Sequence, residues 1–317
     1  MTTLLNSNNS SVNQTSLKGY QQFIVSSRID DLIQKVKPVD QQRKLIDLPV
    51  TATIEEALDL LLANDIRSVP IYQYTVDNKK EYIKIVSALD LLRLLSTQIT
   101  ADTAKVREDV LLITLKEAIH FGENVAILKS SDSLDKLIKW FTIEHRVLIE
   151  QQEPLNYLLL SQMDLIQYFQ LENHRLGSEL LDLSVSDIKP LGVHSIVNFK
   201  ITAIEAFLKL GGDNRLSALP IVDDLGEFVT ELSASDLRGL NRERWPSLSK
   251  PVVMYLKESH GDLLSPKTCH DQFTLSQILT AFALRKADKL WWVNSTSGQL
   301  QGVITLTDII STFASHI

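Results

Sequence analysis

Cysteine is nearly absent from this sequence of 317 residues, because Cys269 is the only one. A single cysteine excludes an intrachain disulfide and a zinc site built from several thiolates, and this scarcity favours a reducing compartment. The sequence also lacks any apolar run of about 18 residues, the length that a membrane-spanning helix needs. Its first 16 residues carry no positive charge and no apolar stretch of signal-peptide length. We therefore expect a cytoplasmic protein, with the nucleus as an alternative location, and a disordered tail over residues 1–19.

An excess of positive charge is also missing. The 32 Lys and Arg residues face 39 Asp and Glu residues, a net charge of −7, which argues against binding to nucleic acid or to an anionic membrane. The phosphate-loop, dinucleotide-binding and zinc-helix motifs are absent, and the seven histidines show no metal-ligand spacing. We therefore expect no enzymatic activity, no metal and no cofactor.

A short pattern occurs four times: Ser or Thr, two further residues, then Asp followed by apolar residues. It appears as SALDLL, SQMDLI, SASDLR and TLTDII. The aspartates of successive copies are 74, 72 and 72 residues apart, which suits a small supersecondary unit and is too long for a solenoid repeat. The chain therefore contains four equivalent units, whose aspartates are Asp90, Asp164, Asp236 and Asp308.

Each unit also has an amphipathic helix before its aspartate. In the first unit, apolar residues with helical spacing follow Thr53, and Glu56 can complete a capping box with this threonine. The same box recurs in two other units, as Thr202 with Glu205 and as Thr274 with Gln277. The second unit keeps only the apolar stripe. Two short apolar runs then follow each helix and predict a β-hairpin, so that each unit is helix, strand, strand, helix.

We expect an α/β protein of four such repeats, paired into two modules. The chain is 44% hydrophobic and long enough for two cores, whereas one repeat alone buries too little surface to be stable. We expect a boundary between the modules at 171–193, a stretch with two glycines and a proline. An insertion at 241–265 contains a VVMYL segment that fits a helix or a short strand. The predicted repeats span residues 20–100, 101–175, 176–245 and 246–317.

The S/T-x-x-D pattern at the second strand-to-helix junction has two interpretations. As a structural element it caps a helix, whose dipole favours an acid in the first turn. As a binding element, a carboxylate at this place can accept both hydroxyls of a ribose while the Ser or Thr hydroxyl assists. Four copies in register favour binding. The candidate ribose-binding residues are Ser87, Asp90, Ser161, Asp164, Ser233, Asp236, Thr305 and Asp308.

Each unit also places a basic residue between its first helix and its first strand. Arginine presents a planar fork of donors that fits phosphate oxygens, and four such residues would offset the acidic net charge locally. A solvated surface side chain is the alternative for each residue taken alone. The candidate phosphate-binding residues from this pattern are Arg67, Arg146, Arg215 and Lys289.

Three segments resemble cystathionine-beta-synthase (CBS) domains, namely TIEEALDLLLANDIRSVPIY, DNRLSALPIVDDLGEFVTELSASDL and LWWVNSTSGQLQGVITLTDII. Four such repeats, from about Phe23 to the C-terminus, resemble the gamma subunit of AMP-activated protein kinase and its regulatory relatives. The resemblance implies that the aspartates hold ribose and that basic residues of several repeats share the phosphates of an adenine nucleotide. It adds His145 to the phosphate positions, because the second repeat keeps the family's His-Arg pair.

We therefore predict a non-catalytic regulatory subunit of the kinase gamma type. It would sense AMP, ADP or ATP and transmit occupancy to kinase catalytic and beta-type subunits, or to another regulated protein. The alternative is a CBS-domain interaction scaffold, such as a phosphatase regulator, with empty or degenerate pockets. Three departures from the family pattern favour this alternative: the second repeat lacks a proline after its His-Arg pair, Asn214 replaces a histidine, and Asp288 precedes Lys289.

Overall fold

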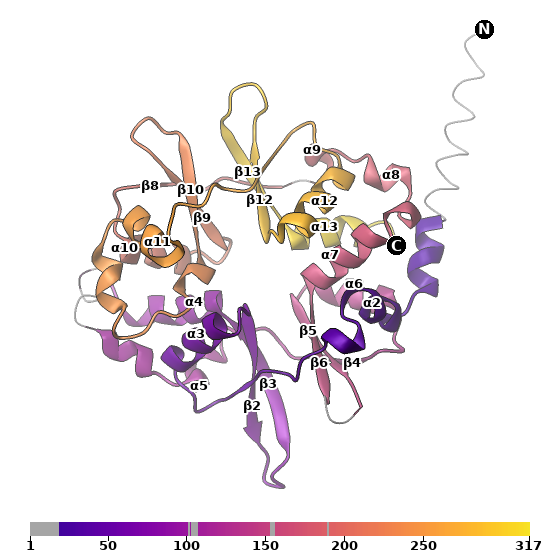
Figure 1. Ribbon diagram of the computed structural model, residues 1–317, viewed down its shortest axis with the longest axis horizontal. Helices are drawn as coiled ribbons and strands as arrows, with labels where there is room; N and C mark the ends of the chain where they lie inside the picture. The colour runs from indigo at the N-terminus through magenta and orange to yellow at the C-terminus, as the bar shows by residue number, and fades with distance from the viewer. Residues whose placement is uncertain (1–18, 101, 103–106, 153–155, 189) are drawn as a thin grey trace. The chain divides into compact units, whose positions relative to one another are not determined.

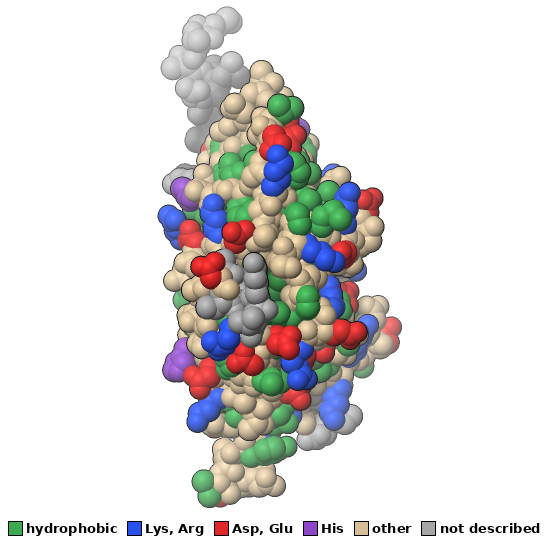
Figure 2. Space-filling model, turned by 90° about the vertical axis from the view of Figure 1, so that its left-hand side faces the viewer, with side chains coloured by type: hydrophobic (Ala, Val, Ile, Leu, Met, Phe, Trp, Pro, Cys, Tyr) green, Lys and Arg blue, Asp and Glu red, His purple; other side chains and the backbone are tan. Residues whose placement is uncertain are grey.

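The computed structural model describes residues 19–100, 102, 107–152, 156–188 and 190–317 (Figure 1). The predicted tail, residues 1–19, lies outside the described residues except for Gly19, which belongs to a helical stretch over residues 19–26. No helix in the described ranges is long and apolar enough to cross a membrane. Figure 2 shows one face of the molecule, on which basic and acidic side chains are interspersed.

Every repeat contains the predicted antiparallel hairpin. The hairpins confirm the two predicted apolar runs in each unit, and the first strand of each hairpin has three or four consecutive buried residues. In all four, the Ser or Thr of the S/T-x-x-D pattern ends the second strand, opposite the start of the first. The strands are β2 (Ser68–Tyr74) with β3 (Lys80–Ser87), β5 (Arg146–Glu150) with β6 (Tyr157–Ser161), β9 (Ala218–Val222) with β10 (Phe228–Ser233), and β12 (Lys289–Val293) with β13 (Leu300–Thr305).

A short parallel strand extends each hairpin into a mixed sheet, which the sequence analysis did not predict. These strands hold two or three residues and are too short to show an alternating pattern. They are β1 (Leu48–Pro49), β4 (Ile127–Lys129), β8 (Val197–Asn198) and β11 (Thr268–His270), which pair with β2, β5, β9 and β12. A further strand, β7 (Leu191–Gly192), joins β13 at the edge of the fourth sheet. Each repeat thus has one short strand before the predicted order of helix, strand, strand and helix.

The predicted first helix of each repeat is confirmed, together with its cap. Thr53, Thr202 and Thr274 form capping boxes with Glu56, Glu205 and Gln277. In the second repeat Ser133 caps the helix alone, by accepting from the backbone N–H of Lys136. These helices are α3 (Ile54–Ala63), α6 (Leu134–Phe141), α10 (Ala203–Gly211) and α12 (Leu275–Arg285).

The predicted second helix is present in the first, second and fourth repeats. For the third repeat the prediction is wrong. It occurs as α4 (Ala88–Gln98), α7 (Gln162–Leu171) and α13 (Leu306–Ala314). In the third repeat only a 3-10 turn, η5 (Ala234–Leu237), follows the pattern. The chain leaves the turn through Gly239, whose φ of 73° favours glycine. Because the N–H of Gly239 donates to the carbonyl of Leu58 at 2.8 Å, a helix does not continue here.

The insertion after this turn supplies a helix of its own. The VVMYL segment lies in α11 (Val252–His260), after the 3-10 turn η6 (Trp245–Ser249), so the helical alternative is the correct one. Tyr255 of α11 packs edge-to-face on Phe207 of α10, with ring centroids 5.5 Å apart. The remaining short elements are α2 (Ile29–Val36), η1 (Val39–Gln41), η3 (Glu108–Leu112), α5 (Leu115–Ala118), η4 (Asn173–Arg175), α8 (Ser178–Leu181) and α9 (Val185–Ile188).

The chain divides into two compact units, as the prediction of two modules requires, but the units combine alternate repeats. One unit, here called the odd unit, comprises residues 46–125 and 194–266 and holds the first and third repeats. The other, the even unit, comprises 1–45, 126–193 and 267–317 and holds the second and fourth repeats. The expected module boundary at 171–193 therefore lies within the even unit, and the chain passes to the odd unit only after Val193.

Helix packing explains the alternate pairing. In the odd unit α4 of the first repeat packs against α10 of the third, and in the even unit α7 of the second packs against α12 and α13 of the fourth. Gly211 permits the approach of α10 to α4, because a Cβ there would lie 3.0 Å from the carbonyl oxygen of Leu92 and clash with Ser96. Each unit has its own buried apolar core. The amphipathic stripes thus bury their surface between repeats that are not neighbours in sequence.

Candidate functional site

The four S/T-x-x-D patterns share one hydrogen-bond geometry. In each, Oδ2 of the aspartate accepts from both the backbone N–H and the hydroxyl of the Ser or Thr three residues earlier. For Asp90 the two donors of Ser87 lie at 2.8 and 2.6 Å, and for Asp308 both donors of Thr305 lie at 2.7 Å. The pairs Ser161 with Asp164 and Ser233 with Asp236 repeat this arrangement. The capping interpretation is therefore correct for all four, and it engages only Oδ2.

The second oxygen, Oδ1, distinguishes the repeats from one another. Within the described part of the chain, Oδ1 of Asp308 accepts no hydrogen bond, because the contacts of this carboxylate all go to Oδ2. Oδ1 of Asp90 lies 3.7 Å from Nη1 of Arg93, one turn further along α4. Oδ1 of Asp236 lies 2.9 Å from Nε2 of His260. A carboxylate that is already capped can thus still offer an acceptor in the fourth repeat.

Two of the carboxylates are shielded enough to alter their acidity. Burial raises the pKa of Asp90 above its ordinary value, although the hydrogen bonds from Ser87 and the charge of Arg93 oppose this effect. Burial likewise raises the pKa of Asp308, against the hydrogen bonds from Thr305. A hydroxyl donor that reached either group would make a hydrogen bond in a shielded environment, where such bonds are stronger.

In the second repeat a lysine from outside the repeat binds the motif aspartate. Lys37, which ends α2, donates from Nζ to Oδ2 of Asp164 at 3.0 Å and to the carbonyl oxygen of Leu159 at 2.8 Å. The side chain of Asp164 is only 8% exposed. Ser161 already gives two hydrogen bonds to the same oxygen, so Lys37 is a third donor to Oδ2 and leaves no acceptor capacity there.

In the third repeat the insertion provides the cation. His260 is the last residue of α11, and its contact with Asp236 raises the pKa of the imidazole above the ordinary value, while partial burial opposes the rise. The charges of Arg238 and Arg244 also oppose it. The insertion that follows η5 therefore returns to the same turn and covers its carboxylate.

The predicted phosphate positions fall into two groups. In the even unit Arg146 and Lys289 are the first residues of their hairpins, directly opposite Ser161 and Thr305. Residues opposite each other in antiparallel strands have Cβ atoms about 5 Å apart, so each basic side chain starts beside the motif. In the odd unit the matching positions hold the small residues Ser68 and Ala218, because the arginines precede the strand.

The arginines of the odd unit lie in the connecting loops. Arg67 is exposed, and so is His145, which precedes Arg146 in the even unit. Arg215 pairs with Asp213, with Nε 3.1 Å from Oδ1 and Nη2 3.0 Å from Oδ2. This hydrogen-bonded contact holds the pKa of Asp213 below its usual range. A phosphate would therefore compete with a neighbouring carboxylate for Arg215.

Three cations near the motif aspartates were missed by the sequence analysis: Lys37, Arg93 and His260. Arg93 also donates from Nη2 to the carbonyl oxygen of Asn214 at 3.2 Å, which ties α4 to the loop that carries Arg215. Its buried Nε has no hydrogen-bond partner in the described residues. The spacing offers no signal for Lys37, since it lies 127 positions from Asp164. For Arg93, the i, i+3 spacing from Asp90 was an available signal.

Neither a metal centre nor a reactive thiol accompanies these residues. The described ranges contain no group of three or more His, Cys, Asp or Glu side chains that could hold a metal ion. Cys269 is buried in β11, and burial raises its pKa to about 12. The thiolate form that acts as a nucleophile is therefore scarce at neutral pH.

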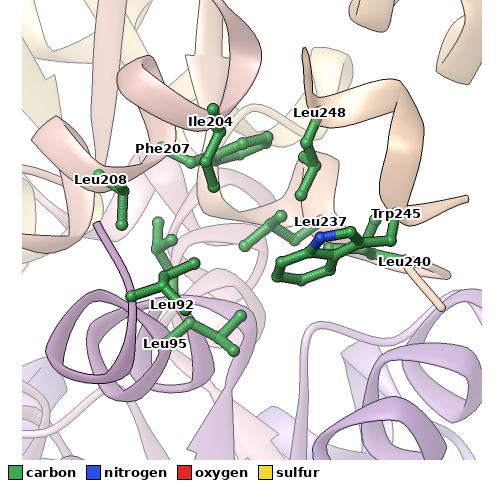
Figure 3. Close-up of a pocket in the computed structure, with 10 residues that line it drawn as sticks. Leu92, Leu95, Ile204, Phe207, Leu208, Leu237, Leu240, Trp245 and Leu248 are labelled. Carbon is green, nitrogen blue, oxygen red and sulfur yellow. The ribbon is translucent and has the colours of Figure 1, made fainter. Parts of the chain in front are cut away.

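A cavity of the odd unit is entirely apolar (Figure 3). It lies between α4, α10 and the segment from η5 to η6, and its volume is about 10 Å³. Leu92, Phe207 and Trp245 are among its lining residues, and it contains no motif aspartate. A nucleotide, which needs polar partners for ribose and phosphate, does not fit this cavity.

The fold and the repeated motif together define a class, that of proteins with four tandem CBS repeats. Residues 36–97 match the CBS domain family. The solved structure of protein MJ1225 from Methanocaldococcus jannaschii, described as an archaeal homologue of the AMPK gamma subunit, has a TM-score of 0.65 and 16% identity, and covers 90% of this chain and 100% of its own. The chain thus contains a CBS domain match over residues 36–97, shares the fold of MJ1225 and resembles kinase gamma subunits.

Curated relatives support a regulatory role. The SNF1-related protein kinase regulatory subunit gamma-like PV42b of Arabidopsis thaliana is 24% identical over 340 residues, which cover 87% of this chain and 93% of the relative. Protein SDS23 of Kluyveromyces lactis is also 24% identical, over 336 residues that cover 92% of this chain and 64% of the relative. A second Arabidopsis thaliana relative, PV42a, is also named as a gamma-like regulatory subunit of SNF1-related protein kinase and is 22% identical over 345 residues, which cover 87% of this chain and 93% of the relative.

Proposed function

We propose that this chain is a non-catalytic regulatory subunit of the kinase gamma type, which binds an adenine nucleotide through the fourth repeat. The observation that carries the proposal is the free Oδ1 of Asp308, next to a capped and shielded Oδ2. A ribose can donate both of its hydroxyls to one carboxylate. Lys289, opposite Thr305 in the hairpin, is the nearest predicted phosphate residue.

Regulation would follow from linkage. A nucleotide can change the behaviour of a partner only if it binds one conformation of the chain more tightly than another. By thermodynamic reciprocity, the partner that prefers this conformation then raises nucleotide affinity by the same factor. For a kinase gamma-type subunit, the partners are the catalytic and beta-type subunits.

Thermal unfolding of the full chain in the presence of AMP, ADP and ATP tests the binding step. A bound nucleotide at about 100 times its dissociation constant stabilises the native state by about 2.7 kcal/mol, which is a clear shift of the midpoint. Asp308→Asn should remove the shift while keeping one oxygen for the cap. The matched control is Asp187→Asn, which alters another capping aspartate of the even unit, in contact with Ser184 rather than with the motif. A shift that survives Asp308→Asn contradicts the proposed site.

A second function, that of an interaction scaffold without a nucleotide, is favoured by the internal ion pairs. Lys37 binds Asp164, His260 binds Asp236, and Asp213 binds Arg215. Each pair uses a residue that the ligand would need. The scaffold predicts no thermal shift with any of the three nucleotides.

Capture of kinase subunits separates the two functions at the level of partners. The full chain would be mixed with purified catalytic and beta-type subunits, with and without AMP. A gamma-type subunit should retain both partners and change its affinity for them with AMP, because of the linkage described above. Failure to retain either subunit at micromolar concentration contradicts the kinase assignment and leaves the scaffold.

A further inference from the structure

The acceptor capacity of the motif carboxylates is unequal. Both oxygens of Asp236 are engaged, since Ser233 donates twice to Oδ2 and His260 contacts Oδ1 at 2.9 Å. In Asp308 only Oδ2 is engaged. A ribose that binds a capped carboxylate needs the remaining oxygen, Oδ1, as its acceptor. The same sequence pattern therefore presents an open acceptor in the fourth repeat and an occupied one in the third.

The position of His260 is set by the helix that carries it. Tyr255, one and a half turns earlier in α11, is buried, and its hydroxyl donates to the carbonyl oxygen of Asp236 at 2.8 Å. The helix is thus anchored on the same turn whose carboxylate His260 contacts. Gly261 follows the last residue of α11 as its C-cap. It has a φ of 82°, and its N–H donates to the carbonyl of Lys257. A cation in the last turn is also favoured by the helix dipole.

The other cations near Asp236 bind elsewhere. Arg238 donates from Nη1 to Oδ1 of Asp65 at 3.1 Å. Arg244 donates to the carbonyl oxygen of Gly239 at 3.0 Å and to the hydroxyl of Ser259 at 3.1 Å. Both arginines act on His260 through their charge. His260 is therefore the side chain that occupies the outer oxygen of Asp236.

We infer that His260 closes the third repeat to a ribonucleotide by occupying the acceptor that a ribose hydroxyl would use. The insertion helix α11 is in this sense an internal competitor of the ligand. The inference rests on the proposed function, because it concerns the same class of ligand at an equivalent motif. Lys37 on Asp164 is a partial parallel, since it binds Oδ2 and leaves Oδ1 without a partner among the described residues.

Calorimetric titration of the full chain with AMP tests this inference through the number of sites. His260→Ala should bind one more AMP per chain than the wild type does. The double variant His260→Ala with Asp236→Asn should lose this additional site. Removal of the competitor frees Oδ1 of Asp236 as an acceptor, so AMP binding at the third repeat should become detectable in the titration. His260→Asn, whose shorter side chain falls short of Asp236, is the second variant if the alanine variant is unstable.

Lys257→Ala is the matched control. It removes a cation from the same helix, and its side chain is exposed and makes no contact with Asp236. This variant should bind AMP as the wild type does. A second site in Lys257→Ala would show that any charge loss in α11 has the same effect, and would overturn a specific role of His260.

The outcomes separate this inference from the proposed function. One AMP per chain in both the wild type and His260→Ala overturns the inference alone. A wild type that already binds two AMP, one of which is lost in Asp236→Asn, also overturns it. Binding that occurs only in His260→Ala supports closure of the third repeat and overturns the proposed function of the native chain. Absence of binding in both proteins overturns both.

Discussion

The third and fourth repeats contain the same motif and end differently. In the fourth, Thr305 caps a nine-residue helix, α13, and Oδ1 of Asp308 has no partner among the described residues. In the third, Ser233 caps a four-residue 3-10 turn, and the insertion helix α11 brings His260 to Asp236. The local hydrogen bonds are alike, since both use Oδ2. The difference lies in what the chain does after the motif, and it decides whether an acceptor is accessible.

The odd and even units also differ in where they place the predicted phosphate-binding residues. The odd unit places its predicted phosphate residues in loops, where Asp213 neutralises Arg215. In the even unit Arg146 and Lys289 lie within the sheet, opposite the motif hydroxyls, and Lys289 is only 7% exposed. A repeated sequence pattern therefore establishes equivalent backbones, but it does not make the sites equivalent.

The largest expected effect comes from replacing a buried phenylalanine in the core of one unit, while the core of the other unit stays intact. Phe207 in the odd unit and Phe282 in the even unit are buried in separate cores. Replacement of either by alanine should lower the free energy of unfolding by about 3–5 kcal/mol, from lost burial and the cavity left behind. Hydrogen exchange should then accelerate mainly in the helices of the altered unit.

The matched control for this comparison is Leu284→Ala. Leu284 lies on α12, close to Phe282 in sequence, and is 77% exposed. Its replacement should change the free energy of unfolding by less than about 0.5 kcal/mol. Equal acceleration of exchange in both units after Phe207→Ala would contradict the independence of the two cores.

A smaller loss of stability is expected when the capping hydroxyl of the third or of the fourth repeat is removed. Thr305→Ala should lower the free energy of unfolding by about 1 kcal/mol, because α13 loses the donor and acceptor of its capping box. Ser233→Ala should have a smaller effect, since the hydroxyl of Tyr255 also holds the turn η5 through the carbonyl of Asp236. Urea unfolding measures both, and Thr305→Ser should restore stability. A larger loss for Ser233→Ala would contradict the role given to Tyr255.

The dependence of stability on pH that arises from His260 in the third repeat should be a smaller effect than the loss of either cap. Because the contact with Asp236 raises the pKa of His260, the folded chain holds this proton more tightly than the unfolded chain does. The resulting stabilisation is complete below the unfolded pKa of about 6.5 and is lost as the pH rises through the higher folded pKa. The charges of Arg238 and Arg244 oppose the rise in the pKa of His260, so the pH range between the unfolded and folded pKa values becomes narrower.

The size of this effect should be about 0.5 kcal/mol or less, since the pair is partly exposed to water and its energy is screened. Histidine NMR signals, assigned with His260→Ala, measure the pKa directly, and Asp236→Asn should lower it. The fourth repeat has no histidine on its motif aspartate and serves as the internal reference. An unchanged pKa of His260 in Asp236→Asn would contradict the contact as its cause.

The smallest expected effect concerns the loop ion pair of the odd unit. Asp213→Asn should lower the free energy of unfolding only slightly, because the side chain of Arg215 is 64% exposed and surface pairs contribute little. The loss should vanish at about 1 M salt, where the Debye length is about 3 Å. Urea unfolding at low and high salt measures the difference, and a loss that persists in high salt would contradict screening.

Much of the fold could be predicted from the sequence because the deciding contacts are local. A capping box joins residues three positions apart, as Thr53 and Glu56 do, and a hairpin joins neighbouring runs. The strands of two residues, such as Leu48–Pro49, escaped prediction because they have no period of their own. The second helix of the third repeat was wrong because its pattern looks helical up to Leu237, whereas the turn at Gly239 is held by a distant carbonyl.

The candidate site was predictable in its residues and not in its occupancy. The motif pairs such as Thr305 with Asp308 were identified from their repetition, and their caps are confirmed. Their roles in binding ribose stay predictions, as do the phosphate roles of Arg67, His145, Arg146, Arg215 and Lys289. Lys37 and His260 could not be assigned to the motif, since neither belongs to the repeated pattern.

The sequence by itself determined four copies of one backbone unit, because periodic apolar residues and short-range caps specify helices and hairpins without reference to distant parts of the chain. Only the tertiary structure decided which repeats share a core and which aspartates remain open to a ligand. Those outcomes depend on surfaces and cations that meet across long stretches of chain, such as Lys37 and Asp164, which are 127 positions apart. Their energies come from burial and desolvation, which spacing along the chain does not encode.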